Sequence, residues 1–281
     1  MSIVIWLYGN SGCEMSMLKN LNINGSMSPL GQKIRRNITR AISDYSMLKN
    51  GDKILVAVSG GIDSSVLLLM LKEIKRKAKI DFALVPVFLD QKFPRLDPAP
   101  FKNWLNSIGF ELTILEFDSY RMIVEKTRKN KSACGICARM RRGILYSYAF
   151  DNGFNKIALG HNRNDLNETV LMNMLFSGKM SGMPPKLRSK DGKNTLIRPL
   201  CYVAKDMIEQ YGAEARIPIL ENTFCDEKGG GTRSLVRNIL KDLDTKNPKT
   251  GENLIASLKN VHLSQLMDKN LWDFDKLERR Q

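Results

Sequence analysis

The stretch from Ser59 to Ser65 concentrates residue types that bind phosphate, with two glycines, three serines and one aspartate. Glycine permits the positive φ of a tight turn and lets an anion approach the backbone closely. The serine hydroxyls can donate hydrogen bonds to phosphate oxygens, and the carboxylate of Asp63 can bind Mg²⁺ or cap a helix. The residues that we expect to hold the phosphates are Ser59, Gly60, Gly61, Ile62, Asp63 and Ser64.

Two apolar runs flank this stretch and predict the elements that position it. Residues 53–58 are short and β-branched, as in a buried parallel strand, and residues 66–71 begin a largely apolar helix. The N-terminus of that helix would direct unpaired N–H groups and a positive dipole end at a phosphate. The string fits Ser-Gly-Gly-x-Asp-Ser, the PP-loop of ATP pyrophosphatases, and lacks the lysine of a Walker A loop. An ordinary strand-to-helix turn is the alternative.

Strands and helices alternate along the rest of the chain, which predicts an α/β fold with a doubly wound parallel sheet. A long loop rich in glycine, proline and lysine is expected over 179–193, and its length indicates a working loop. Strands are expected at 53–58, 82–90, 110–117, 156–160 and 196–200. Helices are expected at 31–50, 98–108, 166–176, 203–212, 232–243 and 252–266, with another running to about Asp151.

Polar residues follow two of the expected strands at their carboxyl ends. In open parallel sheets, ligands bind in the crevice outside these ends. The carboxyl ends of the strands near residues 90 and 160 are therefore candidate parts of the same site as the PP-loop. The candidates at these two ends are Asp90, Gln91, Gly160, His161 and Asp165.

The chain has five cysteines, of which Cys134 and Cys137 form a Cys-x-x-Cys motif. The motif could be a redox pair, or half of a zinc site, although no second pair exists to complete a Cys₄ site. With one further thiolate it could hold an iron–sulfur cluster, in which three protein ligands leave one iron with an open position that can bind sulfide. Spacing alone leaves these alternatives and a purely structural role open.

The composition favours an intracellular protein with an anionic partner. The formal net charge of the 281-residue chain is +15 and its pI is about 9.6, which indicates binding to nucleic acid. The odd number of cysteines and the lack of a secretory signal predict a reducing compartment, the cytoplasm. The apolar run at residues 3–8 is too short to span a membrane, so no membrane partner is expected.

A series of motifs in one order resembles the TtcA family, the tRNA-cytidine(32) 2-sulfurtransferases. The resemblance runs from about Leu30 to about Phe274 and leaves the first 29 residues outside it. It implies a PP-loop ATPase of the adenine nucleotide hydrolase fold, with ATP, Mg²⁺ and a [4Fe-4S] cluster. The motifs are the PP-loop, residues 89–91, residues 134–143, residues 159–161, residues 178–186 and residues 197–200.

The resemblance also implies the reaction and the partners. A cytidine in the tRNA anticodon loop is adenylated at its C2 oxygen and converted to 2-thiocytidine, with sulfur from a donor such as a cysteine desulfurase. The basic loop 179–193 is then a candidate clamp for the unstacked nucleotide. The oligomeric state is open, and a homodimer is compatible with the sequence.

Roles follow from this resemblance for individual residues. The cluster ligands match Cys134, Cys137 and Cys225, whereas Cys201 matches no ligand and is expected in the core. Asp63 is the expected Mg²⁺ partner, and the strand-end residues Asp90, Gln91, Gly160 and His161 surround the nucleoside. Arg141 is assigned charge stabilisation at the adenylated base, and Asp165 general acid or base chemistry.

These assignments divide the chain into three parts. We expect a poorly ordered N-terminal extension over 1–29 and an ATP-binding α/β domain over 30–220 that carries the Cys-x-x-Cys motif. A C-terminal loop and helical part over 221–281 would supply Cys225.

The sequence departs from the family pattern at positions that bear on activity. Ile62 stands where the family usually has lysine, and Asn164 where it has aspartate. Two alternatives therefore remain: a tRNA-uridine thiolase of the same superfamily, and a non-catalytic RNA-binding homologue. Uridine thiolases usually carry additional Cys-x-x-Cys zinc pairs at their ends, and this chain has none.

Overall fold

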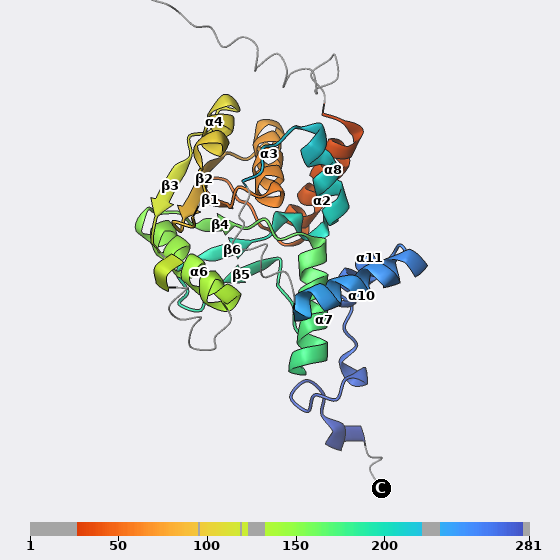
Figure 1. The fold of residues 1–281 in the computed structure, drawn as a ribbon. Helices are drawn as coiled ribbons and strands as arrows, with labels where there is room; N and C mark the ends of the chain where they lie inside the picture. The colour runs from red at the N-terminus through yellow and green to blue at the C-terminus, as the bar shows by residue number, and fades with distance from the viewer. Residues whose placement is uncertain (1–26, 95, 119, 123–132, 221–230, 278–281) are drawn as a thin grey trace, which may run out of the picture.

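The computed structural model describes residues 27–94, 96–118, 120–122, 133–220 and 231–277. Within these ranges one sheet has the strand order β3-β2-β1-β4-β6-β5 (Figure 1). All neighbouring strands are parallel except β5, which runs antiparallel to β6. The strands are β1 (Asp52–Val58), β2 (Phe82–Asp90), β3 (Thr113–Glu116), β4 (Lys156–Ala158), β5 (Lys186–Arg188) and β6 (Thr195–Ile197).

The predicted α/β fold is confirmed, with two corrections. The expected loop 179–193 contains β5, so the sheet is mixed at this edge. The helix expected at 252–266 ends at Ser257, because the chain then turns through the Lys259 N–Ala256 O and Asn260 N–Ser257 O hydrogen bonds. The helices are α2 (Pro29–Asp44), α3 (Ile62–Lys77), α4 (Ala99–Ser107), α6 (Ala133–Asp151), α7 (Arg163–Ser177), α8 (Lys205–Glu214), α10 (Thr232–Lys246) and α11 (Thr250–Ser257), with 3₁₀ turns η1 (Pro199–Tyr202), η2 (Leu263–Gln265) and η3 (Phe274–Leu277).

Helices cover both faces of the sheet, which explains why the central strands are apolar throughout. Successive strand residues face opposite sides, so Ile54 and Val56 join the larger core with α2, α3, α4 and α8. Leu55 faces the other way and packs with Leu145 and Ala149 of α6. In Figure 1, α6 lies on the opposite side of the sheet from α3. This two-sided burial is the arrangement expected of parallel strands.

A buried ion pair joins the amino ends of β1 and β4. Lys156 contacts Asp52, and both side chains are less than a tenth exposed. The same carboxylate accepts hydrogen bonds from the Lys49 backbone N–H at 2.5 Å and from the Asn155 amide at 3.0 Å. Because a buried charge is costly unless it is fully paired, these contacts help to fix how β1 and β4 are aligned.

The C-terminal helices α10 and α11 pack against α7, as Figure 1 shows. The carboxylate of Glu168 on α7 is buried, and Arg237 of α10 donates to it at 2.8 Å. Arg233, one turn earlier on α10, lies 3.6 Å from the same group. These charges fix α10 beside the first turns of α7.

Most of the predicted extension and residues 221–230 of the predicted C-terminal part lie outside the described residues.

No helix in the described part of the chain is both long and apolar enough to cross a bilayer.

Candidate functional site

The strand order creates a switch point between β1 and β4. The chain proceeds from β1 to β2 and β3 on one side of the sheet, and it places β4 and β6 on the other. When the loops after two neighbouring strands run in opposite directions, a crevice opens at the carboxyl ends of those strands. The PP-loop follows β1 there, and Gly160 and His161 follow β4. The structure therefore brings together two groups of residues that are about a hundred positions apart in the sequence.

The first glycine of the PP-loop is required by both conformation and space. Gly60 has φ +77°, in the left-handed region that side chains disfavour. A Cβ added at this position would lie 2.6 Å from the Leu220 side chain. The Leu220 N–H also donates to the Gly60 carbonyl at 3.0 Å, so the segment after α8 helps to fix the conformation of the PP-loop turn.

The serines hold the turn together and leave the helix end open. Ser64 Oγ donates to the Gly61 carbonyl at 3.0 Å and accepts from the Ser59 N–H at 3.1 Å. Gly61 is the N-cap residue of α3, and no side chain caps this helix. The first N–H groups of α3 are therefore available to an anion. This arrangement fits the phosphates of a nucleotide.

Gly160 lets the loop after β4 approach the PP-loop helix closely. A Cβ on this residue would lie 3.0 Å from the backbone nitrogen of Ser64 and 3.1 Å from its Cα. These are backbone atoms in the first turn of α3, which cannot move aside cheaply. Glycine is therefore the residue that this close approach requires.

Asp63 lies between two partners that the sequence analysis did not identify. Its Oδ2 accepts a hydrogen bond from Lys205 Nζ at 2.6 Å, and its Oδ1 accepts one from Asn162 Nδ2 at 2.9 Å. Lys205 is 142 positions away in the sequence and begins α8. No local pattern marks that lysine, because its role depends on how α8 packs against α3.

Asp165 takes part in a capping box at the start of α7. Its Oδ2 accepts the Asn162 N–H at 3.0 Å, while Asn162 Oδ1 accepts the N–H groups of Asn164 and Asp165. The other carboxylate oxygen lies 3.8 Å from Arg233 Nη1. Burial raises the pKa of Asp165 above its ordinary value. The carboxyl thus has a structural role, and its general acid or base role stays a prediction.

His161 is a neutral imidazole surrounded by cations. Its Nδ1 is buried and has no hydrogen-bond partner among the described residues. Burial, and to a lesser extent the nearby charges of Arg198, Arg233 and Arg141, lower the pKa of His161 to about 4. The expected site residue Arg141 therefore lies on the same side of the fold as His161. Arg198 and Arg233 were not predicted, because their relation to the site arises only through packing.

The neutral state of His161 predicts a pH dependence of stability. Its pKa is lower in the folded protein than in the unfolded chain, so the unfolded chain binds more protons between about pH 6.5 and pH 4. This residue's contribution is complete above pH 6.5 and is lost as the pH falls, by at most about 1.4 kcal/mol per pH unit. We expect the free energy of unfolding of His161→Gln, measured by urea unfolding, to change less between about pH 6.5 and pH 4 than that of the wild type. The same change with pH in both proteins would contradict a buried neutral His161.

The Cys-x-x-Cys helix reaches the same edge of the sheet. Gln91, at the end of β2, donates from Nε2 to Cys137 Sγ at 3.4 Å. The neighbouring Asp90 pairs with Lys92 Nζ at 2.9 Å. Cys134 lies one helical turn before Cys137 in α6, but its side chain and all of Cys225 lie outside the described residues. One of the three predicted cluster ligands is thus beside a predicted nucleoside residue.

Cys201 is in the core, as predicted. Its side chain is fully buried in η1, and burial raises the pKa of the thiol to about 12. A thiol that is this hard to ionise is a poor metal ligand, because thiolates rather than thiols bind metals. This burial supports the choice of ligands that excludes Cys201.

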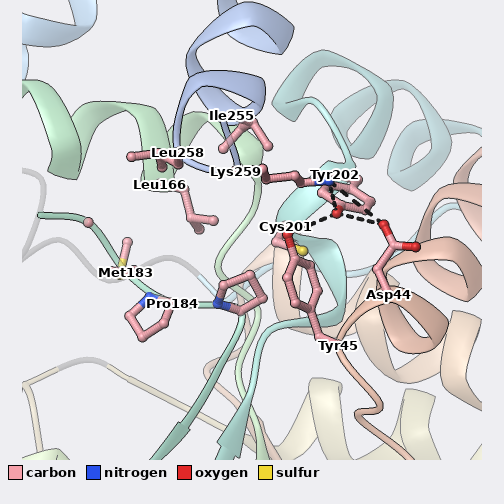
Figure 2. A pocket seen from close by; sticks show the side chains of 12 residues that line it. Asp44, Tyr45, Leu166, Met183, Pro184, Cys201, Tyr202, Ile255, Leu258 and Lys259 are labelled. Carbon is pink, nitrogen blue, oxygen red and sulfur yellow. Dashed lines mark hydrogen bonds and ion pairs between the residues drawn. The ribbon is translucent and has the colours of Figure 1, made fainter. Parts of the chain in front are cut away.

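Cys201 also lines a pocket of about 610 Å³, shown in Figure 2, where α2, α7, α11, η1 and residues 182–185 meet. At the polar end of the pocket the Tyr202 hydroxyl lies 2.8 Å from Asp44 Oδ2 and 2.9 Å from the Tyr45 hydroxyl. Lys259 also contacts the Tyr202 hydroxyl and lies over its ring. These polar groups bond one another, so we interpret them as a network that ties α2 to the C-terminal helices.

Comparison with known proteins identifies the class of protein to which the fold and the site belong. Residues 30–243 match the model of the PP-loop domain family, which agrees with the turn after β1 and the switch-point site. The chain also aligns over most of its length with curated relatives.

It is 43% identical over 250 residues to the tRNA-cytidine(32) 2-sulfurtransferase of Bdellovibrio bacteriovorus, covering 89% of this chain and 96% of that relative. It is 40% identical to the protein of the same name from Hahella chejuensis, covering 95% and 92% of the two chains. The chain belongs to the tRNA-cytidine(32) 2-sulfurtransferase family.

A solved structure agrees with the fold. The U34-tRNA thiolase NcsA from Methanococcus maripaludis, determined with its [4Fe-4S] cluster, superimposes with a TM-score of 0.65. The alignment covers 86% of this chain and 82% of that one at 20% identity. At this identity the likeness establishes a shared architecture.

Proposed function

We propose that this protein is an ATP-dependent tRNA thiolase that converts cytidine 32 to 2-thiocytidine. Family membership supports the reaction, since the relatives bear that name. The observation that carries the proposal is the contact between Cys137 and Gln91, which joins the cysteine motif to the nucleotide edge of the sheet. A cysteine pair with a redox or purely structural role would not need to lie beside the nucleotide edge of the sheet.

The residues of the PP-loop edge fit ATP. The turn from Ser59 to Ser64 would hold the pyrophosphate part through the open end of α3. The nucleoside would lie near the predicted strand-end residues. Mg²⁺ is usually bound through one or two carboxylates together with phosphates, and Asp63 is suitably placed for this at the first turn of α3. No group of three or more potential metal ligands occurs among the described residues, so a site made by protein alone is not indicated there.

The cysteines would hold a [4Fe-4S] cluster through Cys134, Cys137 and Cys225. Cys137 is free and partly exposed, and its motif partner is one turn away on the same helix, which suits two ligands of one cluster. When bound, a cluster with three protein ligands supplies an iron position that can hold sulfide. A sulfur donor such as a cysteine desulfurase, and a homodimeric assembly, stay predictions.

Positive charge near the site would serve the RNA and the reaction. The formal charge of +15 suits a polyanion, and Arg141, Arg198 and Arg233 lie close enough to depress the pKa of His161. Negative charge develops on the α-phosphate oxygens and on the departing pyrophosphate when the C2 oxygen of the base attacks the α-phosphate. Arg141 would stabilise that charge, and Asp165 would act as acid or base if its cap contact opens.

Nucleoside analysis of cellular tRNA tests this function. We expect 2-thiocytidine in tRNA from cells that carry the gene and none from cells in which it is deleted, because the proposed function makes this protein the enzyme that introduces the modification. A change in 2-thiouridine instead would identify a uridine thiolase. An unchanged nucleoside profile would support a non-catalytic RNA-binding homologue and contradict the proposal.

A further inference from the structure

The PP-loop turn has no cation of its own. The stretch from Ser59 to Ser65 contains no lysine or arginine, and its charged residue, Asp63, is negative. Bound triphosphate carries several negative charges, which the N–H groups and the dipole of α3 neutralise only in part. A carboxylate in the first turn of α3 adds repulsion to this balance. The proposed Mg²⁺ would neutralise part of this charge, and any side-chain cation that adds to it has to come from another part of the chain.

Lys205 brings an ammonium group to this turn from α8. Its Nζ lies 2.6 Å from Asp63 Oδ2, in the first turn of α3. An ammonium has three N–H donors, and the contact with Asp63 uses one of them. The Lys205 side chain is 32% exposed, so a ligand that arrives from solvent can reach it.

The position of Lys205 within its own helix is unfavourable. It is the first residue of α8, where the helix dipole repels a positive charge by about 0.3–1 kcal/mol. The N-cap residue Ala204 offers no side-chain hydrogen bond. Asp63 already has a neutral donor in Asn162, so the ion pair is not its only stabilising contact. Glu209, one turn later on α8, lies 3.8 Å from the Lys205 ammonium, but an exposed i,i+4 pair is worth only about 0.3–0.5 kcal/mol and does little more than offset the dipole. The stability of α8 alone therefore gives little reason for a lysine at this position.

Two neighbouring residues fix Lys205 at the turn. Asn164 Oδ1 accepts the backbone N–H of Lys205 at 3.0 Å, which ties the start of α8 to the first turn of α7. Ile62, within the PP-loop, packs against α8 so closely that a Cβ on Gly212 would overlap its side chain. Ile62 thus helps to hold α8, which carries the Lys205 ammonium, against the PP-loop.

We propose that Lys205 is a binding residue for the pyrophosphate part of ATP and supplies from α8 the cation that the PP-loop turn lacks. In the free protein the ammonium is held by Asp63, and a phosphate oxygen takes one of its remaining donors when the nucleotide binds. The inference rests on the proposed use of ATP and adds a residue to it. Because the contact is made to the β- and γ-phosphates, it should affect ATP and pyrophosphate but not AMP.

Equilibrium binding of three ligands to the purified protein tests this role. For Lys205→Gln we expect the Kd values of ATP and inorganic pyrophosphate to rise roughly ten- to hundredfold, as for the loss of one charge-assisted hydrogen bond, with the Kd of AMP within about twofold of wild type. Lys75→Gln is the matched control. This lysine lies in the last turn of α3, pairs with exposed Asp81 at 3.7 Å, and should leave all three values unchanged.

Keeping the charge at the same position separates binding from a structural effect. Lys205→Arg retains a cation there, and we expect it to bind ATP and pyrophosphate more tightly than Lys205→Gln does. Thermal melts establish that each variant is folded. Binding to Lys205→Arg no tighter than to Lys205→Gln, unchanged ATP affinity in Lys205→Gln, or equal losses for ATP and AMP would each overturn the inference. Wild-type protein that binds neither ATP nor pyrophosphate would instead overturn the proposed function.

Discussion

Replacing Asp63 with alanine is expected to reduce ATP-dependent formation of 2-thiocytidine by at least about a hundredfold, the range seen when a principal charge-stabilising group is removed. The variant loses the carboxylate that would hold Mg²⁺ at the phosphates. It also frees Lys205 and Asn162 from their acceptor, so the cation is no longer held in place. Single-turnover assays that measure pyrophosphate release and 2-thiocytidine together would detect both losses.

The fold of this variant should remain intact, because Asp63 is partly exposed and the turn keeps its serine hydrogen bonds. Asp81→Ala is a suitable control, since it removes a carboxylate that pairs with a lysine on the same helix α3 but lies at the opposite end of it. Wild-type ATP turnover in Asp63→Ala would show that the nucleotide site lies elsewhere.

Replacing Cys137 with serine is expected to remove the iron and abolish thiolation while leaving ATP binding in place. Serine keeps the size of the side chain and can still contact Gln91, but its hydroxyl is a far weaker ligand than a thiolate for a cluster. Protein purified without oxygen should be brown, with about four irons per chain in the wild type and close to none in the variant. Iron and sulfide assays with ATP titrations of the same samples measure both properties.

Cys201→Ala provides the control for this experiment. Its side chain is fully buried in η1, so the substitution should lower the free energy of unfolding by about 1–2 kcal/mol through a small cavity and leave the iron content unchanged. Loss of iron from Cys201→Ala together with its retention in Cys137→Ser would mean that the ligands were chosen wrongly.

The part of the site that is local in sequence could be predicted before the structure. Strand β1, the PP-loop and α3 follow one another without interruption, and each has its own signal: a buried β-branched run, paired glycines, and an apolar helix. The ends of β2 and β4 could be assigned because parallel strands place their carboxyl ends at one edge. The same rule places the loop that carries His161 beside the PP-loop, and the hydrogen bond from Asn162 to Asp63 joins the two.

The contacts that complete the site depend on tertiary packing and could not be predicted. Lys205 and Arg233 lie on helices whose register against α3 and α7 is not written in any short motif. Strand β5 was missed for a related reason. Its three residues contain only one apolar side chain, and they become a strand by pairing with β6, which follows six residues later.

The measurement that tests the central claim most directly is mass spectrometry of a tRNA after incubation with the purified protein. The protein is prepared without oxygen and supplied with ATP, Mg²⁺ and sulfide, and matched tRNAs carry cytidine or uridine at position 32. We predict that the fragment containing cytidine 32 gains the mass that results from replacing one oxygen with sulfur, that this gain requires ATP, and that the uridine 32 tRNA is unchanged. Sulfur found at a uridine, or no sulfur in either tRNA with cluster-containing protein, would contradict the account.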